Sequence, residues 1–144
     1  MLVDGAKGGL QAGAIGDLSV LLVEDDDFTR RLMSRLLHDL KVRRVWEASD
    51  GMQALEILRK HGNEVDIAIC DLDMPRMSGL DLLHALRTAT GNPLADLPVI
   101  VLTAHREADT VKRAIAYGIS GYLVKPVSKA DLMKRLTFAI QKGR

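Results

Sequence analysis

Short apolar runs alternate with longer amphipathic stretches along most of the chain, and this alternation restricts the possible folds most strongly. The runs cover residues 19–24, 43–48, 65–70, 98–103 and 119–124. Between them, apolar residues recur every three or four positions, as in a helix with one buried face. Five strands that alternate with five helices predict an α/β fold with a parallel sheet. Because the runs are apolar almost throughout, we expect helices on both faces of that sheet.

The apolar residues of the first predicted helix define the face that we expect to be buried. They are Phe28, Leu32, Leu36, Leu37 and Leu40, which recur at helical spacing. Three later helices begin with a polar pair typical of a helix N-cap. The pairs are Asp50 with Gln53, Ser78 with Asp81, and Ser128 with Asp131. Residues 90–97 contain Gly, Asn and Pro and predict a loop.

The first part of the chain has a different composition from the rest. Residues 1–17 contain five of the twelve glycines and little charge. This composition favours a flexible N-terminal tail, although a weak pattern of apolar residues leaves a docking segment as an alternative. We therefore expect a tail over residues 1–17 and one folded domain over residues 18–144, a length sufficient to bury a core.

Charge and cysteine content exclude several classes of protein. Twenty Lys and Arg against nineteen Asp and Glu give a formal net charge of +1, so no general attraction to nucleic acid or anionic membrane is expected. No apolar segment approaches the roughly 20 residues of a membrane span, and the N-terminus does not resemble a secretory signal. A single cysteine, Cys70, excludes an intrachain disulfide and a cysteine zinc site. These features favour a cytoplasmic protein.

Polar side chains follow four of the predicted strands, where the ligand site of an open parallel sheet is expected. The first strand ends in four consecutive acids, residues 24–27, and the third ends at Asp71, with Asp73 two positions on. Thr103 ends the fourth strand and Lys125 follows the fifth. The fold would gather these groups in one crevice.

Several carboxylates in one crevice repel each other and raise each other's pKa values. A hard divalent cation relieves that repulsion, and oxygen ligands suit Mg2+. Asp71 could then act as a nucleophile that forms an acyl phosphate. Lys125 and the Thr103 hydroxyl could meet the phosphoryl oxygens. The sequence therefore predicts a magnesium-assisted phosphoryl site.

Four signatures make the chain resemble a known family from about residue 19 to residue 142. They are VLLVEDDDFTRRLM, ICDLDMPRMSGLDLL, PVIVLTA and GYLVKP, in this order. They resemble the response-regulator receiver domain of two-component signalling. The resemblance implies a flavodoxin-like doubly wound fold with five helices and a five-stranded parallel sheet in the order 2-1-3-4-5, as in the chemotaxis receivers of this family. The receiver domain would span residues 18–144.

The same resemblance assigns roles to the residues at the strand ends. Asp71 would be the phosphoacceptor. Mg2+ would be held by Glu24, Asp25 and Asp71 together with the backbone carbonyl of Asp73. Thr103 would contact the phosphoryl group, and so would Lys125.

Further positions follow from the resemblance. Thr103 and Tyr122 would form the switch that responds to phosphorylation, and the Lys125–Pro126 peptide would be cis. Arg30 stands five residues after Asp25, at the spacing expected of the family.

Three positions depart from the family pattern or vary within it. Ser78 stands where the family often has Asp, but serine caps a helix equally well, so no functional loss is expected. Asp73 and His105 occupy positions that, by family likeness, flank the phosphoryl group. We expect this pair to tune the rate of hydrolysis.

The resemblance also implies the partners. The phosphoryl group would come from a sensor histidine kinase or a histidine phosphotransfer protein. An unknown downstream protein would bind the face of helix four, strand five and helix five, with no direct nucleic acid and no membrane contact. That face displays basic residues, which could prefer an acidic partner or could only keep the surface soluble: Lys112, Arg113, Lys129, Lys134 and Arg135. Such a domain is not an enzyme in the usual sense, although it assists its own phosphorylation and dephosphorylation.

Three other functions fit parts of the pattern. Asp71-x-Asp73, Thr103 and Lys125 also match, in order, the first three motifs of a haloacid-dehalogenase-type phosphatase. In that family, however, an acidic pair follows the lysine, whereas here the acids come first. A flavodoxin-like cofactor binder needs a phosphate-cradling first loop, and four acids there would repel phosphate. A metal-blind pseudo-receiver is disfavoured by the complete set of acids, Asp, Thr and Lys.

Overall fold

A computed structural model describes residues 12–74, 77–88, 93–105 and 109–142. Its centre is a five-stranded sheet, and every pair of neighbouring strands is parallel. The strands are β2 (Ser19–Val23), β3 (Arg44–Ala48), β4 (Ile67–Asp71), β5 (Val99–Thr103) and β6 (Gly121–Val124). Their spatial order is β3-β2-β4-β5-β6, so the predicted order 2-1-3-4-5 is confirmed.

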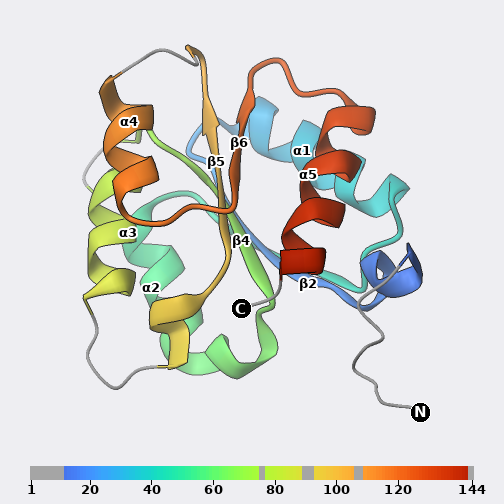
Figure 1. Cartoon of the computed structure of the whole chain (residues 1–144), viewed down its shortest axis with the longest axis horizontal. Coiled ribbons are helices and arrows are strands. Elements are labelled where there is room, and N and C mark those ends of the chain that lie inside the picture. Colours follow the sequence, from blue (N-terminus) through green and yellow to red (C-terminus); the bar gives the residue numbers. More distant parts are fainter. Residues whose placement is uncertain (1–11, 75–76, 89–92, 106–108, 143–144) are drawn as a thin grey trace.

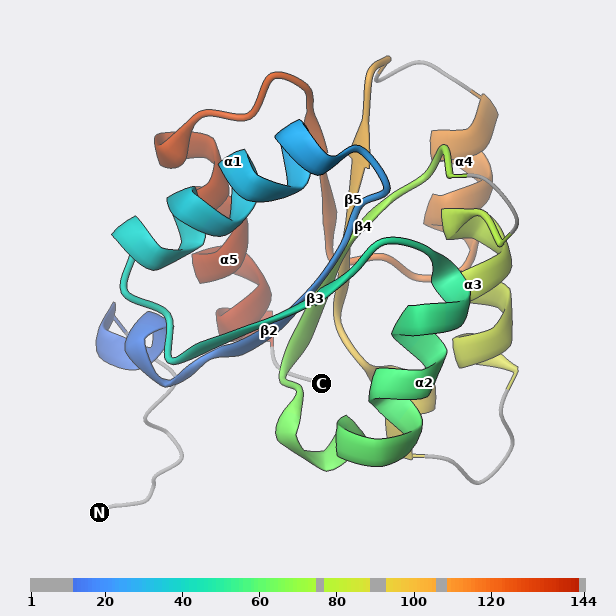
Figure 2. The ribbon, with the colours of Figure 1, turned by 180° about the vertical axis from the view of Figure 1, so that it is seen from behind.

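Helices cover both faces of the sheet, as the apolar strands predict (Figures 1 and 2). The helices α1 (Asp27–Asp39) and α5 (Lys129–Lys142) lie on one face. The helices α2 (Gly51–His61), α3 (Gly79–Arg87) and α4 (Asp109–Ala116) lie on the other. Short 3-10 helices are η2 (Ala12–Asp17), η3 (Gly62–Glu64) and η4 (Pro93–Asp96).

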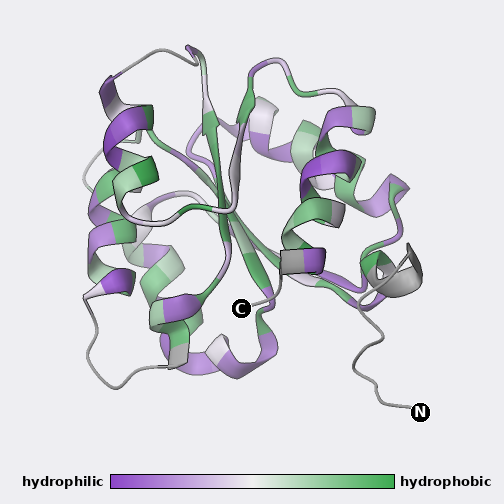
Figure 3. Ribbon diagram, in the orientation of Figure 1, coloured by the Kyte–Doolittle hydropathy of each residue, from purple (hydrophilic) through white to green (hydrophobic). Residues whose placement is uncertain are grey.

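The core consists of two apolar layers separated by the sheet. On β2, Leu21 and Val23 belong to the layer under α2, α3 and α4, whereas Val20 and Leu22 belong to the layer under α1 and α5. The other central strands divide their residues in the same alternating way, because successive side chains of a strand point to opposite faces. Figure 3 shows the apolar strands in the middle and hydrophilic residues on the outer sides of the helices.

The buried face of α1 differs from the predicted one. Phe28 is 72% exposed and Leu32 is 42% exposed, whereas Met33 and Leu37 are buried. Four residues advance about 40° beyond a full helical turn, so a series spaced by four drifts around the helix. The predicted series therefore begins on the solvent side and reaches the core only near Leu36, which is partly buried.

The predicted N-caps all receive hydrogen bonds. Asp50 accepts from the Gln53 amide at 2.8 Å, although the Gln53 side chain turns to the amide and hydroxyl of Ser49 rather than to Asp50. Ser78 and Asp81 form a complete capping box at the start of α3. A third cap joins the hydroxyl of Ser128 to the Asp131 amide at 3.1 Å. Serine thus caps the helix at position 78.

Two segments contain more regular structure than the sequence predicts. Residues 12–17, which fall within the tail expected over residues 1–17, form η2, because Ile15 is buried in the layer under α1 and α5. Residues 1–11 lie outside the described residues. Within the loop expected over 90–97, residues 93–96 form η4 and Leu97 is fully buried. No helix among the described residues has the length and apolar character needed to cross a membrane.

Loss of the Ser78 hydroxyl should weaken the start of α3. We expect Ser78→Ala to lower the free energy of unfolding by about 1 kcal/mol, because the Asp81 amide loses its partner. Ser78→Asp should retain most of the stability, since a carboxylate accepts the same hydrogen bond. Urea unfolding followed by circular dichroism measures both changes. Equal stability of Ser78→Ala and the unchanged protein would contradict the capping role.

Candidate functional site

The parallel register brings the carboxyl ends of the strands together at one edge of the sheet. Val23 pairs with Cys70 and Asp71 pairs with Leu102, so Glu24 follows β2 beside the end of β4. The backbone amide of Lys125 donates to the Thr103 carbonyl at 2.8 Å, which extends the alignment past the end of β6. The side chains that end these strands therefore start from one edge of the sheet.

Lys125 lies between two buried carboxylates. Its Nζ is 2.9 Å from Glu24 Oε1 and 3.1 Å from Asp71 Oδ2. Glu24 is 1% exposed and Asp71 is 4% exposed. Buried carboxylates need partners of this kind, because an unpaired charge is costly away from water. A single ammonium group thus faces two carboxylates.

Burial and the contacts between these charged groups shift the pKa values of Glu24 and Lys125. Burial raises the pKa of Glu24 to about 7, although the contact with Lys125 opposes the shift. Burial alone would lower the pKa of Lys125, but the two carboxylates outweigh it and hold that pKa above its ordinary value. Glu24 Oε1 is a buried oxygen that accepts no hydrogen bond of good geometry from the described residues, despite the nearby ammonium group. The site has more negative charge than one lysine compensates.

Asp25 completes a cluster of three carboxylates. One oxygen each from Glu24, Asp25 and Asp71 can be chosen so that all lie within 4.8 Å of one another. Oxygen ligands at this spacing fit a hard divalent cation. The described residues therefore include a cluster that could hold a metal.

Asp73 contributes its backbone to the site, while its side chain is exposed. The Asp73 amide donates to Asp71 Oδ1 at 3.1 Å, whereas Lys125 contacts Oδ2. Each oxygen of the Asp71 carboxylate thus has its own partner, which fixes the orientation of the carboxylate. Gly79 lets α3 approach this strand end, because a Cβ at that position would meet the Asp71 carbonyl oxygen and Leu72.

Thr103 lies at the end of β5 with its hydroxyl engaged locally. The hydroxyl donates to the His105 carbonyl at 3.0 Å and accepts from the His105 amide at 3.1 Å. The His105 side chain is exposed. Tyr122 is half-buried on β6 and packs against the layer under α2, α3 and α4. Among the described residues, no hydrogen bond joins the side chains of Thr103, His105 or Tyr122 to the carboxylate cluster.

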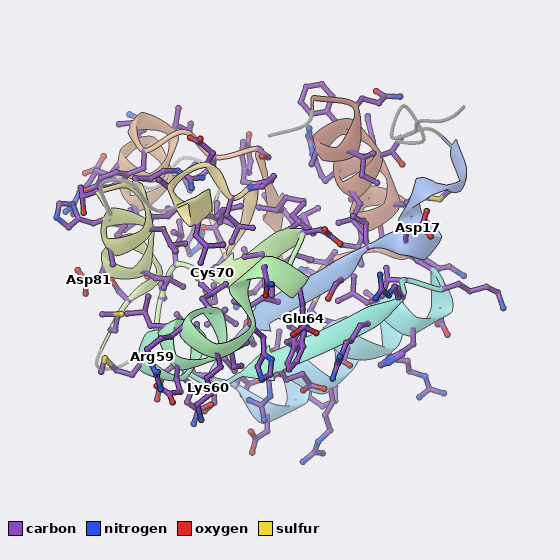
Figure 4. All side chains as sticks on the ribbon, turned by 90° about the horizontal axis from the view of Figure 1, so that it is seen from below. Asp17, Arg59, Lys60, Glu64, Cys70 and Asp81 are labelled. Carbon is purple, nitrogen blue, oxygen red and sulfur yellow. The ribbon has the colours of Figure 1, made fainter. Side chains whose placement is uncertain are left out.

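Three further features lie at the site or next to it: the Lys125–Pro126 peptide, Cys70 and Arg30. The Lys125–Pro126 peptide is cis, as expected from the resemblance. Cys70, labelled in Figure 4, lies on β4 within the interior, and burial raises the pKa of its thiol. Arg30 donates to the Glu24 carbonyl at 2.9 Å and forms an ion pair with Glu47 at 3.3 Å. The contact of Glu47 with Arg30 could not be predicted from the sequence, because nothing distinguishes this glutamate from a solvent-exposed glutamate on a strand.

Comparison with known proteins identifies the family of the chain. The chain matches the family model of the response regulator receiver domain over residues 20–137. It is 36% identical over 120 residues to chemotaxis protein CheY-3 of Vibrio cholerae, which covers 83% of this chain and 89% of that protein. It is also 36% identical over 119 residues to chemotaxis protein CheY of Pseudomonas aeruginosa, with 83% and 93% of the two chains covered.

Solved structures of receivers have the same fold. The Vibrio cholerae chemotaxis protein CheY4 superposes with a TM-score of 0.75 at 30% identity, covering 89% of this chain and 99% of that one. A response regulator receiver domain protein from Clostridium thermocellum superposes with a TM-score of 0.77 at 30% identity, covering 87% and 95%. The chain therefore belongs to the response regulator receiver domains of two-component signalling.

Proposed function

We propose that Asp71 accepts a phosphoryl group from a histidine kinase or a histidine phosphotransfer protein, with Mg2+ bound beside it. The observation that carries the proposal is the position of the Asp71 carboxylate, 3.1 Å from Lys125 Nζ and inside the three-carboxylate cluster. In the transfer, the bond from phosphorus to the donor nitrogen breaks and a bond to an Asp71 oxygen forms. The product is an acyl phosphate.

The residues around Asp71 would prepare its carboxylate for this reaction. The Asp73 amide and the Lys125 ammonium group hold its two oxygens in a fixed orientation, which favours attack on an aligned phosphorus atom. Lys125 also supplies positive charge where the phosphoryl oxygens would lie. Its contact with Glu24 would weaken as those oxygens become its partners.

Side-chain oxygens of Glu24, Asp25 and Asp71 and the backbone carbonyl of Asp73 would hold the Mg2+. When bound, the ion neutralises charge on the phosphoryl oxygens and so stabilises the transition state. The uncompensated negative charge of the site supports this assignment, since one lysine faces two buried carboxylates. The domain would in this way assist its own phosphorylation and dephosphorylation without acting as an enzyme on other substrates.

Phosphorylation would change the partner-binding face through Thr103 and Tyr122. The Thr103 hydroxyl would exchange its bonds to the His105 backbone for one to the phosphoryl group, and Tyr122 would then move inward. A ligand of this kind acts by favouring one of two existing arrangements. The face of α4, β6 and α5 would carry the signal to a downstream protein. It carries exposed basic residues and the half-exposed Ile115: Lys112, Arg113, Lys129 and Lys134.

Incubation with a small acyl phosphate donor tests the acceptor. We expect intact mass spectrometry to detect one phosphate adduct with Mg2+ and little adduct when the metal is removed by a chelator. Asp71→Asn should abolish the adduct, because an amide is a poor nucleophile. Asp81→Asn is the matched control, since Asp81 lies on α3 and is occupied by the capping box. An adduct that persists in Asp71→Asn would contradict the proposal.

The two flanking residues should set the lifetime of the acyl phosphate. Asp73 and His105 are both exposed beside the strand ends, where they can control the approach of water. We expect the double variant Asp73→Asn, His105→Ala to change the rate of phosphate loss, measured by intact mass over time after the donor is removed. An unchanged decay rate would reject the tuning role.

The buried Glu24 should make the metal-free protein less stable as the pH rises. Its pKa is about 7 in the folded protein and about 4.5 in the unfolded chain, so between these values the folded state holds a proton that the unfolded state has lost. The contribution is complete below the lower value and is lost as the pH rises through about 7. The loss is on the order of 3 kcal/mol.

Denaturant unfolding in a chelator at about pH 5 and about pH 8 measures this loss. Relative to the unchanged protein, Glu24→Gln should have a smaller decrease between the two pH values, because the amide does not ionise. Added Mg2+ should stabilise the unchanged protein at the higher pH. An identical pH dependence in the two proteins would exclude Glu24 as the responsible group.

A further inference from the structure

Arg30 connects the loop that carries Glu24 and Asp25 to two other parts of the molecule. Its Nη1 donates to the Glu24 carbonyl at 2.9 Å, and its Nη2 donates to Asp27 at 2.6 Å. Its Nε lies 3.3 Å from Glu47 on β3. The Arg30 side chain is 17% exposed, so this guanidinium group is largely packed. All three contacts use the planar geometry of arginine, which an ammonium group cannot reproduce.

The Glu24 carbonyl belongs to the peptide unit that joins Glu24 to Asp25. Because a peptide unit is planar, a hydrogen bond to that oxygen restricts the rotation of the whole plane and hence the direction in which Asp25 leaves it. No side-chain hydrogen bond or ion pair among the described residues involves the Asp25 carboxylate itself. Its placement in the carboxylate cluster therefore depends on the backbone on either side.

The partners of Arg30 are themselves held in place. Glu47 accepts a hydrogen bond at 3.2 Å from the hydroxyl of Ser34, a buried residue of α1. The Glu24 amide donates at 3.0 Å to the Ala48 carbonyl, next to Glu47 on β3. The loop thus has two connections to β3, one through its backbone and one through Arg30.

We propose that Arg30 is a positioning residue for the metal site: it orients the Glu24–Asp25 peptide so that the Asp25 carboxylate meets those of Glu24 and Asp71. This inference rests on the proposed function, because it assumes that the three carboxylates hold a divalent cation. Residues that orient metal ligands commonly affect metal affinity by about 10- to 100-fold.

Charge and geometry predict opposite effects when Arg30 is replaced. Arg30 is a cation beside a cation site, so removal of its charge should by itself strengthen metal binding. Loss of its orienting contacts should weaken binding. The sign of the change in a neutral variant therefore separates the two roles, and a variant that keeps the charge isolates the geometry.

The test uses Mn2+, which accepts the same oxygen ligands as Mg2+ and has a paramagnetic resonance signal when free. The dissociation constant is measured for the full chain and for Arg30→Lys and Arg30→Met. We expect binding to weaken about tenfold or more in both variants. Arg31→Lys and Arg31→Met are the matched controls, because Arg31 is the exposed next residue of α1 and carries the same charge. Circular dichroism and urea unfolding show whether each variant is folded.

Unchanged binding in Arg30→Lys, or tighter binding in Arg30→Met, would overturn the positioning role. If an Arg30 variant fails to fold, Glu47→Met removes the same connection from the other side. It should also weaken Mn2+ binding at high salt, where long-range charge effects are screened, and unchanged binding there would overturn the role.

Lack of Mn2+ binding in the unchanged protein would overturn the proposed metal site and this inference together. Binding in that protein with no effect of any Arg30 or Glu47 change would overturn this inference alone.

Discussion

Two buried carboxylates that face one ammonium group determine what this site can do. Glu24 and Asp71 would repel each other without Lys125, and with it they still leave more negative than positive charge. The surrounding backbone holds them together, because Asp71 ends β4 and Glu24 directly follows β2 in a hydrogen-bonded parallel sheet. The stability of the fold thus opposes the repulsion within the site. A bound dication would neutralise this excess, and only then could a phosphoryl group approach, as the proposed function requires.

Strand positions, helix order and sheet topology could be predicted because they depend on features repeated along the chain. The apolar runs located each strand to within about two residues, and the polar pairs located the helix starts. The topology came from the family resemblance rather than from periodicity. The buried face of α1 was predicted wrongly, since spacing alone does not show where on the helix the apolar face begins. Phe28 and Leu32 therefore looked like core residues and are exposed.

The candidate site was predictable where it depends on strand ends and less so where it depends on side-chain contacts. The strand ends predict that Glu24, Asp71 and Lys125 lie close together, and the Lys125 ammonium group contacts both carboxylates. The hydrogen bonds of the Thr103 hydroxyl to the His105 backbone follow from a local turn that the sequence does not specify. Glu47 is distant from Glu24 in the sequence and meets Arg30 only in the folded chain, so the sequence alone does not reveal this ion pair.

The two apolar layers allow the core residues on one side of the sheet to change independently of those on the other. Neighbouring residues of a central strand pack against different sets of helices, so the sheet insulates the helices on one side from those on the other. Tyr122 and the buried residues of α4 pack in one layer, whereas the buried residues of α1 and α5 pack in the other. Core substitutions in one layer can therefore accumulate while the other layer keeps its original packing. The sheet makes the two halves separable units of change.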